Sequence, residues 1–262
     1  MTAILTLLTD FGLQDGYPGI MKGVIWQISP GCQIADLTHE IAPQNVLEGA
    51  LAIGRSYPYF PEGTIHIAVV DPGVGTGRRP IAARLGRHYF VGPDNGLFTL
   101  PLQHALAKNE PVAVVQLNQK RYWLPEVSAS FHGRDIFAPV AAYLSNGVPL
   151  DELGSPVKDM LQLEIPQPRR TEYGWRAHIV HIDHFGNLAT DLGTADLAGQ
   201  TVREIRCLGL SVREVSTTYG DHATGELIAM FDSGGSLSIA IVNGSAASRL
   251  SAAIGQAIDV IL

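Results

Sequence analysis

The residue types and spacing best suited to chemistry lie in the segment Val69 to Pro80, which reads Val-Val-Asp-Pro-Gly-Val-Gly-Thr-Gly-Arg-Arg-Pro. An apolar run over residues 64–70 leads into Asp71, then into a turn with glycine at every second position, and then into Arg78. Glycine and proline allow backbone conformations that few other residues adopt. A carboxylate and a permanent cation on one loop beyond a strand occupy a position where α/β proteins carry catalytic groups. The alternative interpretation is a solvated surface turn.

Three other segments offer polar groups with a possible chemical role. Asp10 follows the first apolar run, where it could hold ribose hydroxyls or cap the next turn. His132 lies at a predicted loop-to-helix junction, although a single histidine is more often structural than catalytic. His181, Asp183 and His184 could offer metal ligands, but strand alternation directs the first two to one face and leaves His184 beyond the strand end. We therefore expect no metal site.

The first 150 residues alternate strand and helix patterns that would position these groups. The patterns predict strands over 3–8, 32–37 and 64–70, helices over 17–28, 46–57 and 136–144, and a hairpin over 81–84 and 88–91. In the first helix, Ile20, Val24 and Ile25 are available for one apolar face. Strands alternating with helices favour a mostly parallel sheet with right-handed crossovers. We predict an N-terminal α/β sandwich domain over residues 1–165.

The pattern changes after Asp151. Pro156, Pro166 and Pro168, with polar residues between them, indicate a linker. Short alternating runs follow over 175–182, 202–208, 226–231 and 236–242, separated by Gly, Asp and Asn. Several short strands with turn signals between them are typical of a small antiparallel barrel or sandwich. We predict a smaller C-terminal antiparallel β-barrel domain over residues 166–262.

Composition narrows the class of protein. The 262 residues are 46% hydrophobic and 16% charged, as in compact folded proteins. A net charge of -7 without a basic patch argues against nucleic-acid binding. Cys32 and Cys207 lie in apolar runs, which predicts buried free thiols in a reducing compartment. No signal peptide and no membrane-spanning apolar run is apparent, so we expect a cytoplasmic protein without a membrane partner.

Six sequence blocks, taken together and in order, resemble a known family. They are Thr-Asp-Phe-Gly at 9–12, Val-Asp-Pro-Gly-Val-Gly-Thr at 70–76 with Arg78, Pro-Asp-Asn-Gly at 93–96, Phe-His-Gly-Arg-Asp at 131–135, Asp-His-Phe-Gly-Asn at 183–187 and Asp-Ser-Gly-Gly at 232–235. Their arrangement is similar to that of the adenosine-forming S-adenosylmethionine (SAM) hydrolases, also called SAM hydroxide adenosyltransferases, which are related to fluorinase and chlorinase. The resemblance extends from Leu5 to Ala246.

The resemblance implies a fold, a reaction and a set of site residues. It implies an N-terminal α/β domain, a C-terminal β domain and a homotrimer whose active site lies between the N-domain of one subunit and the C-domain of the next. It implies that SAM is a substrate cleaved at the ribose 5′ carbon by a water-derived nucleophile, giving adenosine and methionine, with no cofactor. The matching catalytic positions are Asp71, Arg78 and His132, and the matching binding positions are Asp10 for ribose, Asp183 and Ser233 for methionine, and Phe185, Asn187, Tyr219 and Asn243 for adenine.

The chain also departs from the halogenating relatives. Fluorinase has a tyrosine where Asp71 stands, a halide-contacting serine where Gly133 stands, and an arginine where Gly234 stands. An anionic Asp71 should repel fluoride or chloride, which favours water as the nucleophile. Because the arginine is replaced, the resemblance leaves open how the methionine carboxylate is bound. It also leaves open whether Asp71 or His132 accepts the proton from water.

Three alternatives to a SAM hydrolase stay open at this point. A SAM-dependent halogenase would use a halide in place of water. A sensor that binds SAM or adenosine with little catalysis would keep the binding residues but would not need Asp71, Arg78 and His132 together. A metal-dependent phosphohydrolase could use Asp10 and Asp71 at strand ends, and would lose activity with a chelator.

Overall fold

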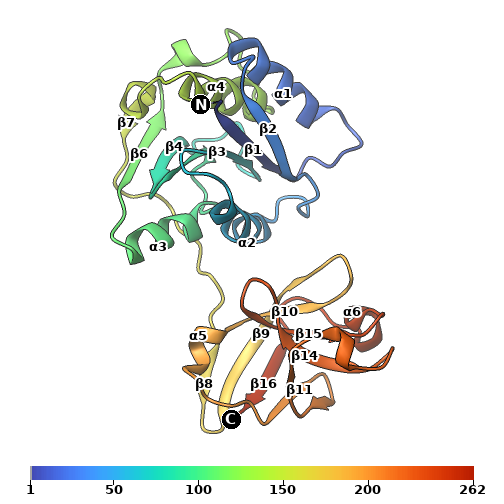
Figure 1. The fold of residues 1–262 in the computed structure, drawn as a ribbon. Helices are drawn as coiled ribbons and strands as arrows, with labels where there is room; N and C mark the ends of the chain where they lie inside the picture. Colours follow the sequence, from blue (N-terminus) through green and yellow to red (C-terminus); the bar gives the residue numbers. More distant parts are fainter. Residues whose placement is uncertain (1) are drawn as a thin grey trace. The chain divides into compact units, whose positions relative to one another are not determined.

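The computed structural model describes residues 2–262. The chain divides into two compact units, the first ending at Leu163 and the second running from Glu164 to Leu262 (Figure 1). This division lies next to the boundary expected at residue 165. None of the helices within residues 2–262 combines the length and the apolar composition that crossing a membrane requires.

The first unit is built on a seven-stranded sheet with the order β2-β1-β3-β5-β4-β6-β7. The strands are β1 (Ile4–Thr9), β2 (Gln33–Thr38), β3 (Ile65–Val69), β4 (Pro80–Leu85), β5 (His88–Pro93), β6 (Val112–Leu117) and β7 (Gly154–Pro156). Strands β2, β1, β3 and β5 run parallel, whereas β4, β6 and β7 extend the sheet with antiparallel pairing. The short turn between β4 and β5 allows only an antiparallel hairpin. The predicted α/β fold is confirmed, and the parallel pairing occupies one half of the sheet.

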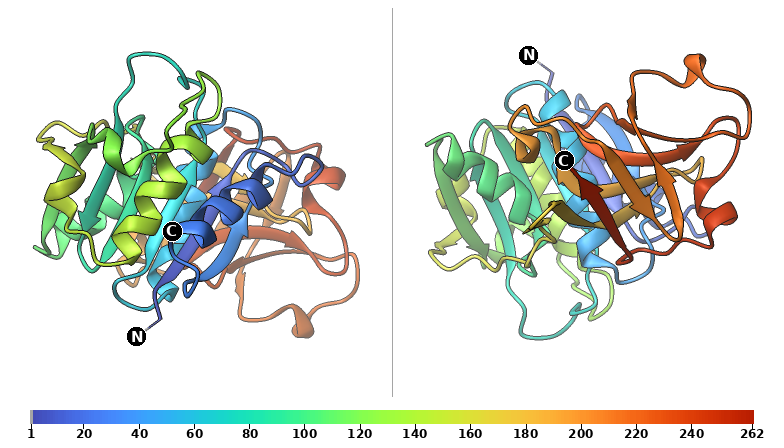
Figure 2. Two further views of the ribbon diagram at one scale, coloured as in Figure 1. Left: turned by 90° about the horizontal axis from the view of Figure 1, so that it is seen from above. Right: turned by 90° about the horizontal axis from the view of Figure 1, so that it is seen from below.

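Helices cover both faces of this sheet. They are α1 (Tyr17–Ile28), α2 (Val46–Ser56), α3 (Thr99–Ala107) and α4 (Ala138–Ser145), with shorter helical turns at Tyr57–Tyr59, Lys120–Tyr122, Gly133–Phe137 and Leu150–Leu153. Figure 2 shows α1, in dark blue, beside α4, in yellow-green, over one face. Side chains of α1 and α4 share one buried core with the sheet, and side chains of α2 and α3 share the core on the other face. The first unit is therefore a layered α/β sandwich.

Two details of the first unit differ from the sequence expectation. Ile20 is 43% exposed, so its predicted place on the buried face of α1 is wrong. The buried face of α1 carries Met21, Val24 and Ile25 instead. Ile20 precedes Met21 by one residue, which turns its side chain by about 100° around the helix axis. Pro156, expected in a linker, belongs to β7 at the edge of the sheet, where a missing N–H costs no ladder hydrogen bond.

The second unit is a nine-stranded sheet with the order β12-β11-β16-β9-β10-β15-β14-β13, to which β8 adds by pairing with β9. Its elements are β8 (Arg169–Thr171), β9 (Gly174–Ile182), β10 (Leu188–Gly193), α5 (Thr194–Leu197), β11 (Glu204–Cys207), β12 (Leu210–Val212), β13 (Val215–Ser216), a helical turn at Tyr219–Asp221, β14 (Leu227–Phe231), β15 (Ser236–Ile241), α6 (Ala246–Leu250) and β16 (Ala257–Ile261). Pairing is antiparallel except between β13 and β14. Because β12 also packs against β14, the sheet curves back on itself around one apolar core, and the predicted β-barrel is confirmed.

The parallel half of the first sheet positions the chemically interesting loops. Strands β1, β2 and β3 end at Thr9, Thr38 and Val69, so the loops that follow them leave from the same edge of the sheet. Open α/β sheets bind ligands at this carboxyl edge. Asp10 and Asp71 both lie in these loops.

The two cysteines bear out their predicted state. Cys32 and Cys207 are both buried and neither forms a disulfide. Burial raises the pKa of the Cys207 thiol to about 11, so that thiol is protonated and unreactive near neutral pH.

Candidate active site

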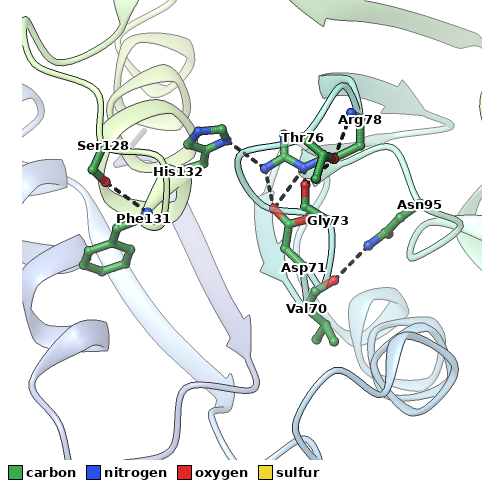
Figure 3. A network of polar contacts seen from close by, with 9 residues as sticks. All are labelled: Val70, Asp71, Gly73, Thr76, Arg78, Asn95, Ser128, Phe131 and His132. Atoms are coloured by element: carbon green, nitrogen blue, oxygen red, sulfur yellow. Dashed lines mark hydrogen bonds and ion pairs between the residues drawn. The ribbon is translucent and has the colours of Figure 1, made fainter.

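The loop after β3 brings Asp71 and Arg78 into direct contact (Figure 3). Nε of Arg78 donates to both carboxylate oxygens of Asp71, at 2.9 and 3.0 Å, and Nη2 also donates to Oδ2. Only 5% of the Asp71 side chain and 10% of the Arg78 side chain are exposed. A forked guanidinium on a carboxylate is among the strongest and most directional ion pairs in proteins. The loop therefore holds an acid and a cation in a single orientation.

Arg78 also binds His132. Its Nη2 lies 2.9 Å from Nδ1 of His132. Because a guanidinium only donates, Nδ1 accepts this bond, and the proton of the neutral imidazole lies on Nε2. Burial, together with the charge of Arg78, lowers the pKa of His132, which keeps the ring neutral near neutral pH. The three residues expected to be catalytic thus form one connected cluster.

Backbone contacts hold the Asp71 loop in place. Nδ2 of Asn95 donates to the carbonyl oxygen of Val70 at 2.8 Å, directly before the acid. Gly75 has a φ of +76°, and a Cβ there would lie 2.3 Å from the carbonyl oxygen of Ala129. Only glycine fits at this contact, since any side chain would push the loop away from the segment that leads to His132.

A buried carboxylate holds the segment that carries His132. Asp135 is fully buried and accepts from the backbone N–H and the hydroxyl of Ser128, at 2.8 and 2.9 Å, and from Nε of Arg134 at 2.6 Å. The Ser128 hydroxyl accepts in turn from the backbone N–H of Phe131 at 3.0 Å. Burial by itself raises the pKa of Asp135, but the bonds from Arg134 and Ser128 outweigh it and lower that pKa below its usual value. An ionised Asp135 therefore fixes the turn that presents His132.

Asp10 makes the turn contact that one interpretation of its position predicts. Its Oδ2 accepts the backbone N–H of Gln44 at 2.8 Å, which ties the loop after β1 to the loop after β2. Within residues 2–262, no hydrogen bond is made to its other oxygen, Oδ1. Asp10 thus holds a turn with one oxygen, and its contact to a ribose hydroxyl stays a prediction.

The binding residues expected in the C-terminal half surround one cavity of the second unit. The cavity has a volume of about 790 Å³ and is lined by Asp183, Phe185, Asn187, Tyr219, Met230, Asp232, Ser233, Ile241, Val242, Asn243 and Gly244. All six of the residues predicted in this half, Asp183, Phe185, Asn187, Tyr219, Ser233 and Asn243, are among them. The structure therefore brings together side chains that are separated by up to sixty positions in the sequence.

Asp183 shapes one wall of this cavity. Its Oδ1 accepts the backbone N–H groups of Phe185 and Asn187, at 2.9 and 2.8 Å, and its Oδ2 accepts Nδ2 of Asn187 at 2.8 Å. These bonds form a tight turn that leaves the Phe185 ring 73% exposed. An exposed aromatic ring on a rigid turn is a suitable surface for stacking a flat ligand.

A second carboxylate makes the cavity acidic. Asp232 accepts the backbone N–H of Gly234 at 2.8 Å, and neither lysine nor arginine is among the residues that line the cavity. Burial raises the pKa of Tyr219, and the charges of Asp183 and Asp232 raise it further. A cavity with two anions and an exposed ring fits a ligand that carries positive charge and a flat aromatic group.

The expected site residues therefore form two groups, the cluster and Asp10 on the first unit, and the cavity on the second. Across residues 2–262, no three His, Cys, Asp or Glu side chains are grouped so that they could hold a metal ion. His184 lies beyond the end of β9 at Ile182, as expected, but Asp183 lies beyond it too, so the prediction that His181 and Asp183 share one face of the strand is wrong.

Comparisons with known proteins cover both units. The profile of the SAM hydroxide adenosyltransferase N-terminal domain matches residues 5–154, and that of the C-terminal domain matches residues 177–259. The chain belongs to the SAM hydroxide adenosyltransferase family. The resemblance inferred from the six sequence blocks is thereby confirmed.

Several members and relatives of this family are similar over most of the chain. A protein of Salinispora tropica named (R)-S-adenosyl-L-methionine hydrolase is 38% identical over 263 residues, covering 99% of this chain and 98% of its own length. A protein of the same name from Thermus thermophilus is 39% identical over 253 residues, 93% of each chain. The fluorinase of an Actinoplanes species is more distant, at 27% identity over 74% of this chain and 73% of its own. A crystal structure of an uncharacterised conserved protein from Thermotoga maritima superposes with a TM-score of 0.90 at 34% identity, covering 98% of this chain and all of that one.

Some residues of this family member were missed by sequence reasoning. Ser128 and Asn95 hold the segments that carry His132 and Asp71, and Asp232 lines the cavity of the second unit. Asp232 and Asn95 lie inside the sequence blocks quoted above, so the blocks marked them without indicating a role. Ser128 precedes its block, and no local pattern points to it.

Proposed function

We propose that this protein hydrolyses SAM to adenosine and L-methionine by attack of a water-derived nucleophile on the ribose 5′ carbon. The observation that carries the proposal is the Asp71–Arg78–His132 cluster, a neutralised acid and a neutral imidazole joined by one guanidinium. The hydrolase names of relatives at 36–39% identity support the same reaction. SAM is the substrate, and the reaction needs no cofactor.

The proposed step balances without a general acid. A water oxygen forms a bond to the 5′ carbon while the bond from that carbon to sulfur breaks. The electron pair of the broken bond stays on sulfur, which turns the sulfonium into the neutral thioether of methionine. Adenosine keeps the water oxygen as its 5′ hydroxyl. One proton must leave the water, so the site needs a proton acceptor rather than a donor.

We assign the proton transfer to Asp71 within this proposal. Nδ1 of His132 is occupied by Arg78, and its Nε2 carries a proton, so the neutral ring has no free lone pair for water. Oδ1 of Asp71 accepts from Nε of Arg78 alone and keeps a lone pair for the water proton. Arg78, which binds Asp71 and His132 at the same time, fixes the position of both side chains around the water.

Substrate binding follows from the remaining site residues. Oδ1 of Asp10 would accept ribose hydroxyls, and the ring of Phe185 would stack on adenine with Asn187, Tyr219 and Asn243 around it. Asp183, with Ser233, would bind the methionine ammonium group. Assembly as a homotrimer with a site shared between subunits, and a cytoplasmic location, also belong to this proposal.

Product analysis tests the reaction against its alternatives. Purified protein is incubated with SAM, with and without chloride, and with and without a chelator, and the products are separated by chromatography. We expect adenosine and methionine under all four conditions. A chlorinated deoxyadenosine would indicate a halogenase, unchanged SAM would indicate a sensor, and loss of activity with chelator would indicate a metal-dependent enzyme. Light scattering at several protein concentrations tests the trimer.

A further inference from the structure

A chain of polar contacts connects helix α1 to the loop after β1. Nζ of Lys22 binds Oδ2 of Asp36 at 2.5 Å, and Oδ1 of Asp36 lies 3.1 Å from Nε2 of His39. Nδ1 of His39 lies 2.9 Å from the hydroxyl of Thr9. That hydroxyl accepts the backbone N–H of Phe11 at 3.2 Å. The proposed reaction uses none of these side chains.

The direction of each contact can be assigned from the groups involved. Burial alone raises the pKa of Asp36, but hydrogen bonds from Lys22 and His39 outweigh it and lower that pKa, so Asp36 is an anion. Nε2 of His39 is buried and faces this carboxylate at an angle that departs from an ideal hydrogen bond, so it carries the proton. Nδ1 then accepts from the Thr9 hydroxyl, whose lone pair is left for the N–H of Phe11. One arrangement of protons thus fits the contacts between His39, Thr9 and Phe11, while Nε2 of His39 and Asp36 make an ion-pair contact.

A break in the regular sheet places His39 at the end of this chain. Leu7 of β1 is paired with Asp36, but the next residue, Leu8, is paired with Thr38, so β2 carries one extra residue. Such a bulge bends a strand and redirects the side chains that follow it, and bulges are common beside active sites. His39 is 3% exposed as a result, and its carbonyl oxygen accepts the backbone N–H of Gly12 at 2.8 Å.

These contacts surround Asp10 on both sides. Thr9, which precedes it, is fully buried and held by His39, and Phe11, which follows it, is held by the Thr9 hydroxyl. The carboxylate itself is held through Oδ2 by the backbone N–H of Gln44, a residue with a φ of +65°. Non-glycine residues adopt such a φ only when their surroundings hold it. The direction of the free Oδ1 of Asp10 is therefore set by the neighbouring loops.

We infer that His39 is a positioning residue that acts through Thr9 to hold Asp10 where its free oxygen meets the ribose hydroxyls of the substrate. The inference rests on the proposed function, because it needs a ribose-containing substrate. His39 does not touch the substrate itself. Its loss affects binding of the ribose hydroxyls, while the Asp71–Arg78–His132 cluster stays intact.

The test compares two substrates in variants that remove one hydroxyl. Thr9→Val keeps the shape of the side chain and removes the contact to His39, whereas Thr9→Ser keeps the hydroxyl. KM and kcat are measured with SAM and with a SAM analogue that lacks the ribose hydroxyls. We expect Thr9→Val to raise KM for SAM about fivefold, with kcat changed less than about twofold and KM for the analogue unchanged. His39→Leu should reproduce the effect, and Thr9→Ser should restore wild-type behaviour.

The same strand provides a matched control. Thr6 is also fully buried in β1, and its hydroxyl lies 2.7 Å from Nδ1 of His66, but Thr6 lies four residues before Asp10 and its partner His66 belongs to β3. Thr6→Val should lower the melting temperature as Thr9→Val does and leave KM for SAM unchanged. A Thr9→Val variant that weakens SAM and the analogue equally would overturn the inference.

Failure of the inference and failure of the proposed function give different results. If the wild-type protein cleaves SAM but binds the analogue as tightly as it binds SAM, Asp10 does not bind the ribose hydroxyls. The inference is then overturned, while the proposed hydrolysis of SAM stands. If the wild-type protein binds SAM more tightly than the analogue and Thr9→Val keeps the same preference, only the inference about His39 is overturned. If neither substrate is cleaved and neither binds, the proposed function is wrong and the inference is overturned with it.

Discussion

Replacing Arg78 by lysine tests the arrangement of the catalytic cluster. The guanidinium binds both oxygens of Asp71 and Nδ1 of His132 at the same time. A lysine keeps the charge but presents one ammonium group on a flexible stem, so it cannot reproduce the fork and the contact to His132 together. The loss of two hydrogen bonds involving charged groups, at about 1.5 kcal/mol each, amounts to about 3 kcal/mol. We expect kcat to fall by about a hundredfold.

The assay is adenosine release at saturating SAM, and the neighbouring arginine supplies its control. Arg79 binds Asp94 through Nε at 2.8 Å and Asp159 through Nη1 at 2.7 Å, and none of its contacts involves His132. Arg79→Lys should lower the melting temperature by a similar amount and leave kcat within about twofold of wild type. A folded Arg78→Lys variant with wild-type kcat, or an equal loss of kcat in Arg79→Lys, would refute the reasoning.

Three further predictions concern other parts of the molecule. Burial, together with the nearby charge of His88, lowers the pKa of His66 from 6.5 to about 3. Between pH 6.5 and about 3, the histidine therefore binds a proton in the unfolded chain but not in the folded one. Stability should therefore fall by up to about 5 kcal/mol as pH falls from about 6.5 to about 3, and urea unfolding of a His66→Leu variant at a series of pH values should show a flatter profile. Gly75→Ala should lower kcat and the melting temperature together, because its Cβ would meet Ala129; calorimetry and the adenosine assay measure both, and an unchanged kcat would show that the loop tolerates the change. Phe185→Ala should raise KM about fivefold or more with little change in melting temperature, because the residue is 73% exposed and its ring contacts the neighbouring ring of His184; an unchanged KM would remove the ring from the binding site.

Local patterns in the sequence were sufficient for most secondary structure. The helix predicted over 17–28 matches α1, and the hairpin after β3 matches β4 and β5. Several elements were not predicted, namely the helices α3, α5 and α6 and the strands β6, β7, β8, β10, β12, β13 and β16. Pro101 and His104 interrupt the apolar pattern of α3, and its first turn lacks a capping side chain.

Tertiary contacts limited what the sequence could predict about the site. Asp71, Arg78 and His132 were identified from their sequence blocks, but their contact spans 54 positions and depends on the fold. His39 carries no motif, and its relation to Asp10 arises from a bulge that shifts the register by one residue. Asp135 lies in one of the quoted sequence blocks, but the sequence does not show that its carboxylate is buried and accepts hydrogen bonds from Ser128.

The central claim is that the cluster around Arg78 directs water to the ribose 5′ carbon of SAM. It is tested most directly by hydrolysis in water enriched in a heavy oxygen isotope, with mass spectrometry of both products. The account predicts one labelled oxygen in adenosine, at the 5′ hydroxyl, unlabelled methionine, and strongly reduced turnover in an Asp71→Asn variant. Label in methionine, adenosine without label, or full turnover in Asp71→Asn would contradict it.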